Sequence, residues 1–266
     1  MRPSTESFQF TKWYLDGVST AGQVLVAYWT ELRWRGLHLT WHSVAHTDPS
    51  GSLQEQTSLV PVAPPALGHR MLTWAAPALG LSLEYQSLAP SYSLLLHATT
   101  DGSVLWYCEV PVARVTGTRR GRPPMELTGY AERMEFSLPP WRLPIRELRW
   151  GRWIADSGQR GLVWNDWRSE DRPRTWVVLD GNELQDGRVF DDGVAARDFS
   201  LKLVEPRELR SRVLSELVDR VPGLSHLLPE TIMALRETRW MARGELRQRG
   251  GHSVWGTAIF EHVIMG

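Results

Sequence analysis

The sequence predicts an all-β protein built from two antiparallel β-barrel domains in tandem. Short segments rich in β-branched and aromatic residues recur along the chain, separated by Gly, Pro or Asp-Gly turns. Strands at this spacing are typical of a sandwich or a barrel. The prolines of SLPPWRLP, residues 137–144, predict a stiff connector. We therefore expect one β-domain at 1–140 and a second at 145–266.

Six segments of the first half are predicted to be strands. In WRGLHLTWHSVAH every second residue falls on one face, which is the period of a strand. The dipeptide Asp101-Gly102 predicts a hairpin turn. The six predicted strands are 23–29, 34–46, 69–75, 81–88, 92–98 and 104–110.

The second half repeats this style, with one exception. Segments 149–156, 161–168, 174–180, 239–250 and 252–266 have strand patterns, and Asp-Gly turns recur at 180–181, 186–187 and 192–193. The exception is EPRELRSRVLSELVDRVPG. Its Pro206 suits a first helical position and its apolar residues recur at helical spacing, so the sequence predicts a helix near 206–220 that flanks the second domain.

The composition limits the classes of function and partner. The 30 basic residues are matched by 30 acidic ones, so we expect no nucleic-acid partner. No apolar run reaches the roughly 20 residues that span a bilayer, and MRPSTESFQF lacks the pattern of a secretory signal. The single cysteine, Cys108, lies in the apolar run VLWYCEV and is predicted to be a buried, inert thiol rather than a nucleophile. A cytoplasmic location fits these features best.

The 14 tryptophans are far above ordinary usage. Tryptophan supplies a large flat apolar surface and one N–H donor. Such richness suits the interior of a β-protein or a cavity for a flat apolar ligand. For each single tryptophan, packing in the core is the alternative interpretation.

Three motifs follow one another in an order found in a known family. KWYLDGVSTAGQVLVAYW, LTGYAERM and LRWGRW resemble the motifs W-W/Y-Y/F-x-D-x-x-S-x-x-G, G-x-G-Y-x-D and W-x-W-S/G-R of the carotenoid 1,2-hydratases, also called hydroxyneurosporene synthases. The resemblance covers the first half and the connector, whereas residues 150–266 match only in general pattern. Plant tocopherol cyclases and fungal decalin-forming Diels–Alderases belong to the wider superfamily.

The resemblance implies two lipocalin-like β-barrels with a hydrophobic pocket and an enzyme that needs neither a metal nor an organic cofactor. Its relatives hydrate, cyclise or guide a cycloaddition at carbon–carbon double bonds of isoprenoids or polyenes. Hydratases follow the Gly-Tyr pair with Asp-x-Asn or His-Asp-His-Asn. In this chain the acidic position is kept as Glu132, while the asparagine and histidine neighbours are replaced.

Carboxyl groups beside aromatic rings are candidate acids for protonating an alkene. A carboxyl group in apolar surroundings has a raised pKa, and the faces of aromatic rings stabilise a cation. Glu132 and Asp16 are the predicted proton donors. Tyr130 shares one strand face with Glu132 and is the predicted partner that stabilises charge. Salt-bridge or turn roles are the alternative for both acids.

Several aromatic residues near these acids are candidate ligand contacts. Trp13 and Tyr14 precede Asp16 in the chain. Trp164 precedes a third carboxyl group, Asp166, which is also flanked by aromatic rings, although Asn165-Asp166 has the character of a turn.

The histidines of the first half share strand parity. His38 and His42 lie about 13 Å apart along a straight strand, which is too far for one metal ion. They are candidate ligand contacts, with solvent-facing positions as the alternative. Neither HExxH, a nucleophile elbow, a phosphate loop nor a cysteine pair occurs, so we expect no metal site and no nucleotide-dependent reaction.

Two arginines bracket Trp150 in LRWGRW. An arginine that stacks on tryptophan, or pairs with a carboxylate such as Glu147, is a common structural use. Trp150 and Arg152 are therefore candidates both for ligand contact and for a structural role, and the family resemblance places them between the domains.

Three classes of function remain open from the sequence. The first is a cofactor-independent enzyme acting on double bonds of a hydrophobic polyene or isoprenoid. The second is a lipocalin-like carrier of a lipophilic molecule, which predicts an apolar pocket without a buried acid. The third is an interaction module with an exposed apolar patch. The oligomeric state is left open.

Overall fold

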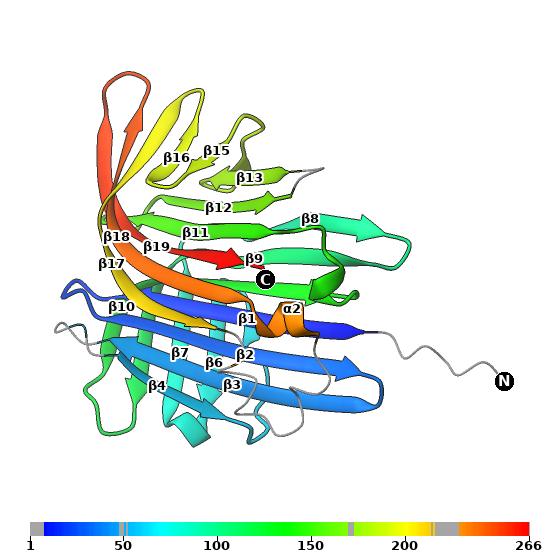
Figure 1. Cartoon of the computed structure of the whole chain (residues 1–266). Helices are drawn as coiled ribbons and strands as arrows, with labels where there is room; N and C mark the ends of the chain where they lie inside the picture. The colour runs from blue at the N-terminus through cyan, green and yellow to red at the C-terminus, as the bar shows by residue number, and fades with distance from the viewer. Residues whose placement is uncertain are drawn as a thin grey trace. The chain divides into compact units, whose positions relative to one another are not determined.

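The computed structural model describes residues 8–47, 51, 53–169, 173–213, 215 and 229–265. The chain divides into two compact units, Met1–Pro140 (unit 1) and Trp141–Gly266 (unit 2). In the described residues each unit is built around one antiparallel sheet (Figure 1). The predicted all-β fold class is confirmed.

Unit 1 is a ten-stranded sheet in the residues that the structure describes. Its strand order is β4-β3-β2-β1-β10-β9-β7-β6-β5, and β8 pairs with the first half of β9. The elements are β1 (Gln9–Val18), β2 (Val24–Trp34), β3 (Leu37–Thr47), β4 (Leu53–Ser58), β5 (Ala66–Gly68), β6 (Met71–Ala76), the 3-10 turn η1 (Pro77–Leu79), β7 (Leu81–Ser87), β8 (Tyr92–Thr99), β9 (Gly102–Arg119) and β10 (Met125–Phe136). The 3-10 turn η2 (Pro140–Arg142) begins at the last residue of unit 1 and ends in unit 2.

Unit 2 is a nine-stranded sheet over its described residues. Its strand order is β14-β13-β12-β11-β19-β18-β17-β16-β15, and β17 and β18 bend strongly along their length (Figure 1). The elements are β11 (Glu147–Ala155), β12 (Gly161–Arg168), β13 (Arg174–Leu179), β14 (Asn182–Glu183), β15 (Arg188–Phe190), β16 (Gly193–Ala196), β17 (Phe199–Val213), the helix α2 (Glu230–Met233), β18 (Arg236–Gln248) and β19 (Ser253–Ile264).

The two units repeat one topology. In each, the first four strands form a meander and the last strand of the unit returns to pair with the first, as β10 pairs with β1 and β19 with β11. Strand β8 is the addition in unit 1. The repeat allows positions in one unit to be compared with their counterparts in the other.

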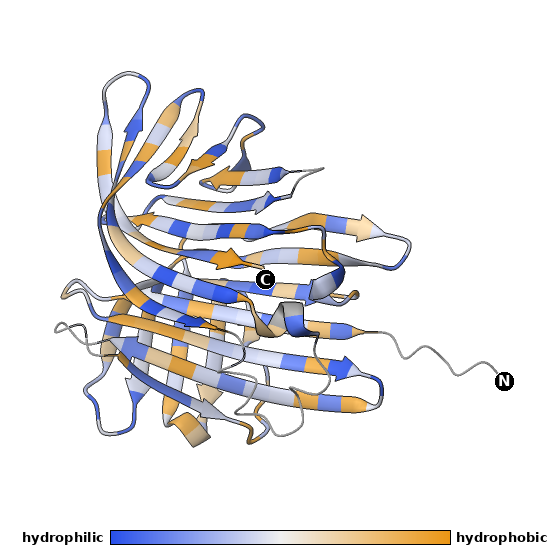
Figure 2. Ribbon diagram, viewed as in Figure 1, coloured by the Kyte–Doolittle hydropathy of each residue, from blue (hydrophilic) through white to orange (hydrophobic). Residues whose placement is uncertain are grey.

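Alternation of apolar and polar residues shapes both sheets, and it is visible as alternating colours along the strands (Figure 2). In β7 the burial alternates without exception from Leu81 to Ser87. The inward side chains of unit 1 form one core that includes Trp13, Trp29 and Trp74. A separate core in unit 2 contains Trp153 and Trp164. Many of the tryptophans are therefore core residues.

The predicted strand 34–46 is confirmed from Leu37 onwards as β3, but its start is wrong. Strand β2 ends at Trp34, which pairs with Leu37, the first residue of β3. Between them Arg35 and Gly36 both have positive φ, at 50° and 77°. This is the backbone of a two-residue hairpin turn. The turn was hidden because arginine rarely adopts positive φ.

The predicted helix near 206–220 is wrong over its first half. Residues up to Val213 belong to β17, which pairs with β18 along its whole length. Register shifts occur between Val204 and Arg207 and between Glu208 and Arg210, and Pro206 lies at the first of these bulges. Proline is tolerated at a bulge because the ladder hydrogen bond is already missing there. Residues 214 and 216–220 lie outside the described residues.

Helices contribute little to the described part of the chain. Within that part, no helix has both the length and the apolar character needed to cross a membrane.

Candidate functional site

Two tyrosines and two carboxyl groups meet on β1 and β10 of unit 1. Tyr14 lies opposite Glu132, and Asp16 lies opposite Tyr130. Their side chains share the sheet face opposite to the core residues Leu15 and Ala131, as strand alternation requires. We call these four residues the tyrosine–carboxylate cluster. All four are buried, with Asp16 and Tyr130 at 0% exposure.

Glu132 is held by two donors on a single oxygen atom. The indole Nε1 of Trp106 donates to Oε2 at 2.6 Å, and the hydroxyl of Tyr130 donates to the same Oε2 at 2.7 Å. Burial, followed by the nearby Cys108 and Glu132, raises the pKa of Tyr130 far above its ordinary value. Tyr130 therefore stays protonated and acts as a hydrogen-bond donor. The carboxyl group has one fixed orientation in a buried environment.

Asp16 has a comparable arrangement. The Tyr14 hydroxyl donates to Oδ2 of Asp16 at 2.9 Å, and the Tyr85 hydroxyl donates to the backbone oxygen of Asp16 at 3.1 Å. Gly129 makes the second contact possible. A Cβ at Gly129 would lie 2.2 Å from the Asp16 oxygen and 3.2 Å from the Tyr85 ring. The ring of Tyr14 also lies 6.2 Å from that of Tyr130, centroid to centroid.

A tyrosine that sequence reasoning missed lies beside this cluster. The ring of Tyr92 packs edge-on against Trp106 at 5.8 Å. Its hydroxyl is buried beside the Cys108 thiol, a weak hydrogen-bond partner, and it has no nitrogen or oxygen partner among the described residues. Burial, with contributions from Cys108 and Glu132, raises its pKa far above the ordinary value, so it remains a donor. Trp106 was missed as well, although its two-residue spacing from Cys108 in VLWYCEV places both on one strand face.

Cys108 is fully buried, as predicted. Burial raises the pKa of its thiol well above the ordinary range. A thiol that stays protonated is a poor nucleophile, which supports the inert role.

The repeat shows that the cluster is particular to unit 1. Gly129 faces Gly17 in the β1–β10 pair, and Gly256 faces Ala155 in the β11–β19 pair. A Cβ at either Gly129 or Gly256 would lie 2.2 Å from a backbone oxygen of the partner strand, so these glycines are counterparts. On this alignment Tyr14, Asp16, Tyr130 and Glu132 correspond to Arg152, Ile154, Thr257 and Ile259. Unit 2 thus carries neither acid at these positions.

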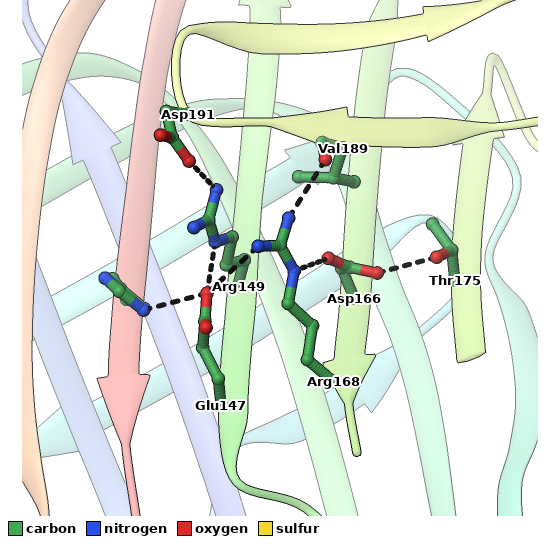
Figure 3. Close-up of polar contacts among 8 residues, drawn as sticks. Glu147, Arg149, Asp166, Arg168, Thr175, Val189 and Asp191 are labelled. Carbon is green, nitrogen blue, oxygen red and sulfur yellow. Dashed lines mark hydrogen bonds and ion pairs between the residues drawn. The ribbon is translucent and has the colours of Figure 1, made fainter. Parts of the chain in front are cut away.

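The remaining candidate acid, Asp166, belongs to an ionic network in unit 2 (Figure 3). Arg168 donates to its Oδ2 at 2.8 Å, and the Thr175 hydroxyl donates to its Oδ1 at 2.6 Å. Glu147 is the other anchor, in contact with Arg149, Arg168 and His262. Burial opposes ionisation of Glu147, but the hydrogen bond from Arg149 and the charges of Arg149, Arg168 and His262 lower its pKa. Because both carboxylates are engaged by arginines of the same sheet, we interpret Asp166 and Glu147 as structural residues.

We expect Asp166→Asn to affect stability more than activity. The amide keeps one acceptor but loses the charge that pairs with Arg168, so the free energy of unfolding should fall by about 1–2 kcal/mol. Urea denaturation followed by tryptophan fluorescence measures this loss. The turnover of Asp166→Asn, corrected for the fraction of folded protein, should stay within about twofold of that of wild type. A large loss of turnover in a folded variant would return Asp166 to the candidate acids.

The candidate histidines occupy different environments. His38 is exposed at the β2–β3 hairpin and lies 2.8 Å from Glu31. His42 is 1% exposed, and its ring meets Trp74 edge-on at 6.1 Å. The Nε2 atom of His42 is buried without a hydrogen-bond partner among the described residues. Burial therefore lowers the pKa of His42.

We expect His42 to make unit 1 sensitive to acid. Below pH 6.5, the ordinary value for histidine, the unfolded chain binds a proton that the folded chain does not. The free energy of unfolding should therefore fall as the pH drops from 6.5 towards the folded-state pKa, and His42 should contribute no pH dependence above 6.5. His42→Gln should reduce this fall, whereas substitution of the exposed His69 should not. Urea titrations at several pH values measure the free energy of unfolding. If it depends on pH below 6.5 as steeply in His42→Gln as in wild type, the prediction is contradicted.

The other predicted contact residues lie outside the tyrosine–carboxylate cluster or in the cores. Trp13 belongs to the core of unit 1, with the Arg133 guanidinium 5.6 Å from its ring. Trp164 belongs to the core of unit 2. Arg152 is 1% exposed and donates to the backbone oxygen of Thr257 at 3.0 Å, while Trp150 is buried nearby on the same strand. The described residues hold no group of three or more His, Cys, Asp or Glu side chains suited to a metal ion.

Comparison with solved structures identifies the fold. Neither the protein-family models nor the sequences of curated proteins match the chain. One structure of CghA superimposes with a TM-score of 0.62 at 14% identity, covering 97% of this chain and 89% of CghA. A structure of CghA with Sch210972 gives 0.60 at 12% identity over the same shares.

A second solved protein, kievitone hydratase from Nectria haematococca, gives a TM-score of 0.51 at 9% identity, covering 99% of this chain and 90% of that one. Identities this low establish the fold alone. The chain therefore has the lipocalin-like tandem fold that the sequence motifs predicted.

Proposed function

We propose that this protein is a cofactor-independent enzyme that acts on a carbon–carbon double bond of a hydrophobic polyene or isoprenoid, by hydration or ring closure. The observation that carries the proposal is Glu132, a buried carboxyl group that Trp106 and Tyr130 hold in a single orientation. CghA, crystallised with Sch210972, and kievitone hydratase share the fold and lend support to this class of reaction.

The hydrogen bonds of Glu132 support one of its two oxygens as the atom that carries the proton. Oε2 accepts from both Trp106 and Tyr130, so in the neutral acid Oε2 is the carbonyl oxygen and Oε1 carries the proton. Transfer of that proton to one alkene carbon leaves a cation on the other. The two donors then stabilise the carboxylate that remains, because charge-assisted hydrogen bonds are stronger than neutral ones. Nothing has to reorient during the transfer.

The second half of the reaction needs a base and a surface that tolerates positive charge. In hydration, water adds to the cation and releases a proton; in ring closure, a second double bond adds and a neighbouring C–H loses a proton. We assign the proton-accepting role to Asp16, which Tyr14 orients at 2.9 Å. The rings of Tyr14 and Tyr130 are positioned to stabilise the cation between the two events.

Tyr92 completes the assignment. Its buried hydroxyl is a donor whose partner in the described residues is the Cys108 thiol, a weak acceptor. A carbonyl or hydroxyl oxygen on the substrate would satisfy it and fix the position of the double bond. The proposed substrate is therefore a conjugated or isoprenoid chain that carries at least one oxygen atom.

A lipophilic carrier is the alternative that the sequence left open. A carrier gains nothing from a buried carboxyl group, because its desolvation costs free energy that an apolar side chain would not. Two such groups, Asp16 and Glu132, lie on one face of unit 1. Their presence favours the enzyme.

The proposal is tested by incubating the purified protein with a lipophilic extract of its source cells and following products by mass spectrometry. A product heavier by about 18 mass units indicates hydration, and an isomer of unchanged mass indicates ring closure. Native mass spectrometry of the same sample reports retained molecules. A ligand that is retained and returned unaltered would reject the enzyme in favour of the carrier.

A further inference from the structure

Unit 1 contains a second cluster that the proposed reaction does not use. It lies where β4, one edge of the sheet, approaches the hairpin between β9 and β10. Arg119 donates to Oε1 of Gln56 at 3.2 Å, and Arg122 donates to Oε1 of Gln54 at 2.8 Å. Within the described residues, β4 and β5 are the two edges of the sheet and do not pair with each other. The two arginines therefore link β4 to the β9–β10 hairpin.

Among the described residues, no ion pair balances the charge of Arg119. Its side chain is buried, with the whole residue 7% exposed, and its Nη1 atom has no hydrogen-bond partner in the described part of the chain. Its bonded partner, Gln56, is neutral. Burial, followed by the like charge of Arg122, lowers the pKa of Arg119. A buried, unpaired guanidinium group is costly for the folded state.

The cluster is well suited to an anion. Arg122, Gln54 and Gln56 are exposed and can be reached from solvent. Arg119 is buried behind them, so an anion that reaches its Nη1 atom must displace a side chain that covers it. Both glutamine oxygens point at arginines, which leaves the amide N–H groups as further donors. A planar guanidinium group matches the geometry of a carboxylate. One carboxylate would offset the buried charge of Arg119.

Apolar residues adjoin the cluster on the inner side. Arg119 lies opposite Leu81 in the β7–β9 pair, and Leu79 and Leu81 both belong to the core of unit 1. The segment 59–65, which joins the two edge strands, exposes Leu59 at 41% and Val60 at 60%. Leu59 and Val60 follow Gln56 by three and four residues, so the exposed apolar side chains that a ligand bound at Arg119 could contact lie further along the chain from β4.

We propose that Arg119 and Arg122 form the anion-binding end of a second ligand site in unit 1, which takes a monocarboxylic acid with an apolar chain. The site is separate from the tyrosine–carboxylate cluster and does not depend on the proposed function. Nη1 of Arg119 is the principal donor to the carboxylate, and Arg122 is the second.

The test is isothermal titration calorimetry of the full chain with sodium octanoate, 1-octanol and inorganic phosphate. We expect octanoate to bind at least tenfold more tightly than octanol, and phosphate to bind weakly. Arg119→Met should weaken octanoate at least tenfold. Arg120→Gln is the matched control, because Arg120 is the exposed neighbour whose side chain donates to the Pro77 backbone oxygen. The affinity of this variant for octanoate should equal that of wild type.

Thermal denaturation without ligand separates this role from a structural one. Loss of an unbalanced buried charge should leave the Tm of Arg119→Met equal to or above that of wild type, whereas a structural arginine would lower it. If Arg119→Met does not fold, Arg122→Gln at the exposed position gives the same comparison, with an expected loss of about threefold or more in octanoate affinity. Equal affinities for octanoate and octanol, unchanged binding in the arginine variants, or phosphate binding more tightly than octanoate would each overturn the proposal.

Discussion

Glu132→Gln is expected to abolish proton-driven turnover while leaving unit 1 folded. The amide oxygen of glutamine can still accept from Trp106 and Tyr130, as Oε2 of Glu132 does. The variant has no acidic proton, so a hydration or a proton-initiated ring closure should slow by about 10²–10⁴-fold, the usual contribution of a general acid. The measurement is initial rate of product formation by mass spectrometry, at a protein concentration corrected for the folded fraction.

The same variant distinguishes among the reactions in the proposed class. A cycloaddition needs orientation and one or two hydrogen-bond donors rather than a proton. Its rate in Glu132→Gln should fall by less than about tenfold. Asp166→Asn is the matched control, because it also exchanges a buried carboxyl for an amide but lies in the ionic network of unit 2. Equal turnover by Glu132→Gln and wild type on a substrate shown to be hydrated would refute the assignment of Glu132.

The turns show what local sequence does and does not reveal. Asp180-Gly181 was recognised as a turn, and both residues have positive φ, at 52° and 82°. Arg35-Gly36 has almost the same backbone, at 50° and 77°, yet its local sequence predicts a continuous strand. The difference is chemical, since Asp-Gly is a strong signal for this turn and arginine is not.

The segment around Pro206 shows how tertiary pairing overrides a local pattern. Its apolar residues recur at helical spacing, but β18 supplies hydrogen bonds along the segment up to Val213. Two bulges accommodate the proline and shift the alternation of apolar and polar residues along β17. The apolar residues therefore no longer recur at every second position, and their spacing resembles that of a helix. A single sequence contains no information about β18 as a partner.

The candidate site was accessible to sequence reasoning only in part. Alternation on one strand places Tyr130 and Glu132 on the same face, and it does the same for Tyr14 and Asp16. That the two pairs lie opposite each other depends on β1 pairing with β10, at the two ends of unit 1. Such pairing cannot be derived from local pattern. The hydrogen bond from Trp106 to Glu132 likewise depends on the pairing of β9 with β10.

Comparison of the two units explains why the site depends on one glycine. Gly129 and Gly256 are counterparts that let a neighbouring strand approach closely, and this requirement belongs to the fold, since both units keep it. In unit 1 the space left by Gly129 is also used by Tyr85, which donates to the backbone of Asp16. The same feature therefore supports the fold in both units and the position of an acid in one.

Gly129→Ala should consequently impair both stability and activity. Its Cβ would lie 2.2 Å from the Asp16 backbone oxygen and 2.7 Å from the Val115 side chain. Because a backbone atom must move, we expect the free energy of unfolding to fall by about 3 kcal/mol or more. The shift should displace Asp16 and lower turnover by at least about tenfold even in the folded fraction. Urea denaturation and the product assay measure the two effects separately.

Gly256→Ala and Gly68→Ala are the matched variants. In Gly256→Ala the Cβ would lie 2.2 Å from the Ile154 backbone oxygen, so a similar loss of stability is expected. Its folded fraction should retain turnover, because Ile154 stands where unit 1 has Asp16. Gly68→Ala meets no atom closer than 3.7 Å and should change stability by less than about 0.5 kcal/mol. Equal loss of turnover in Gly129→Ala and Gly256→Ala, at equal folded fraction, would show that activity does not depend on the tyrosine–carboxylate cluster alone.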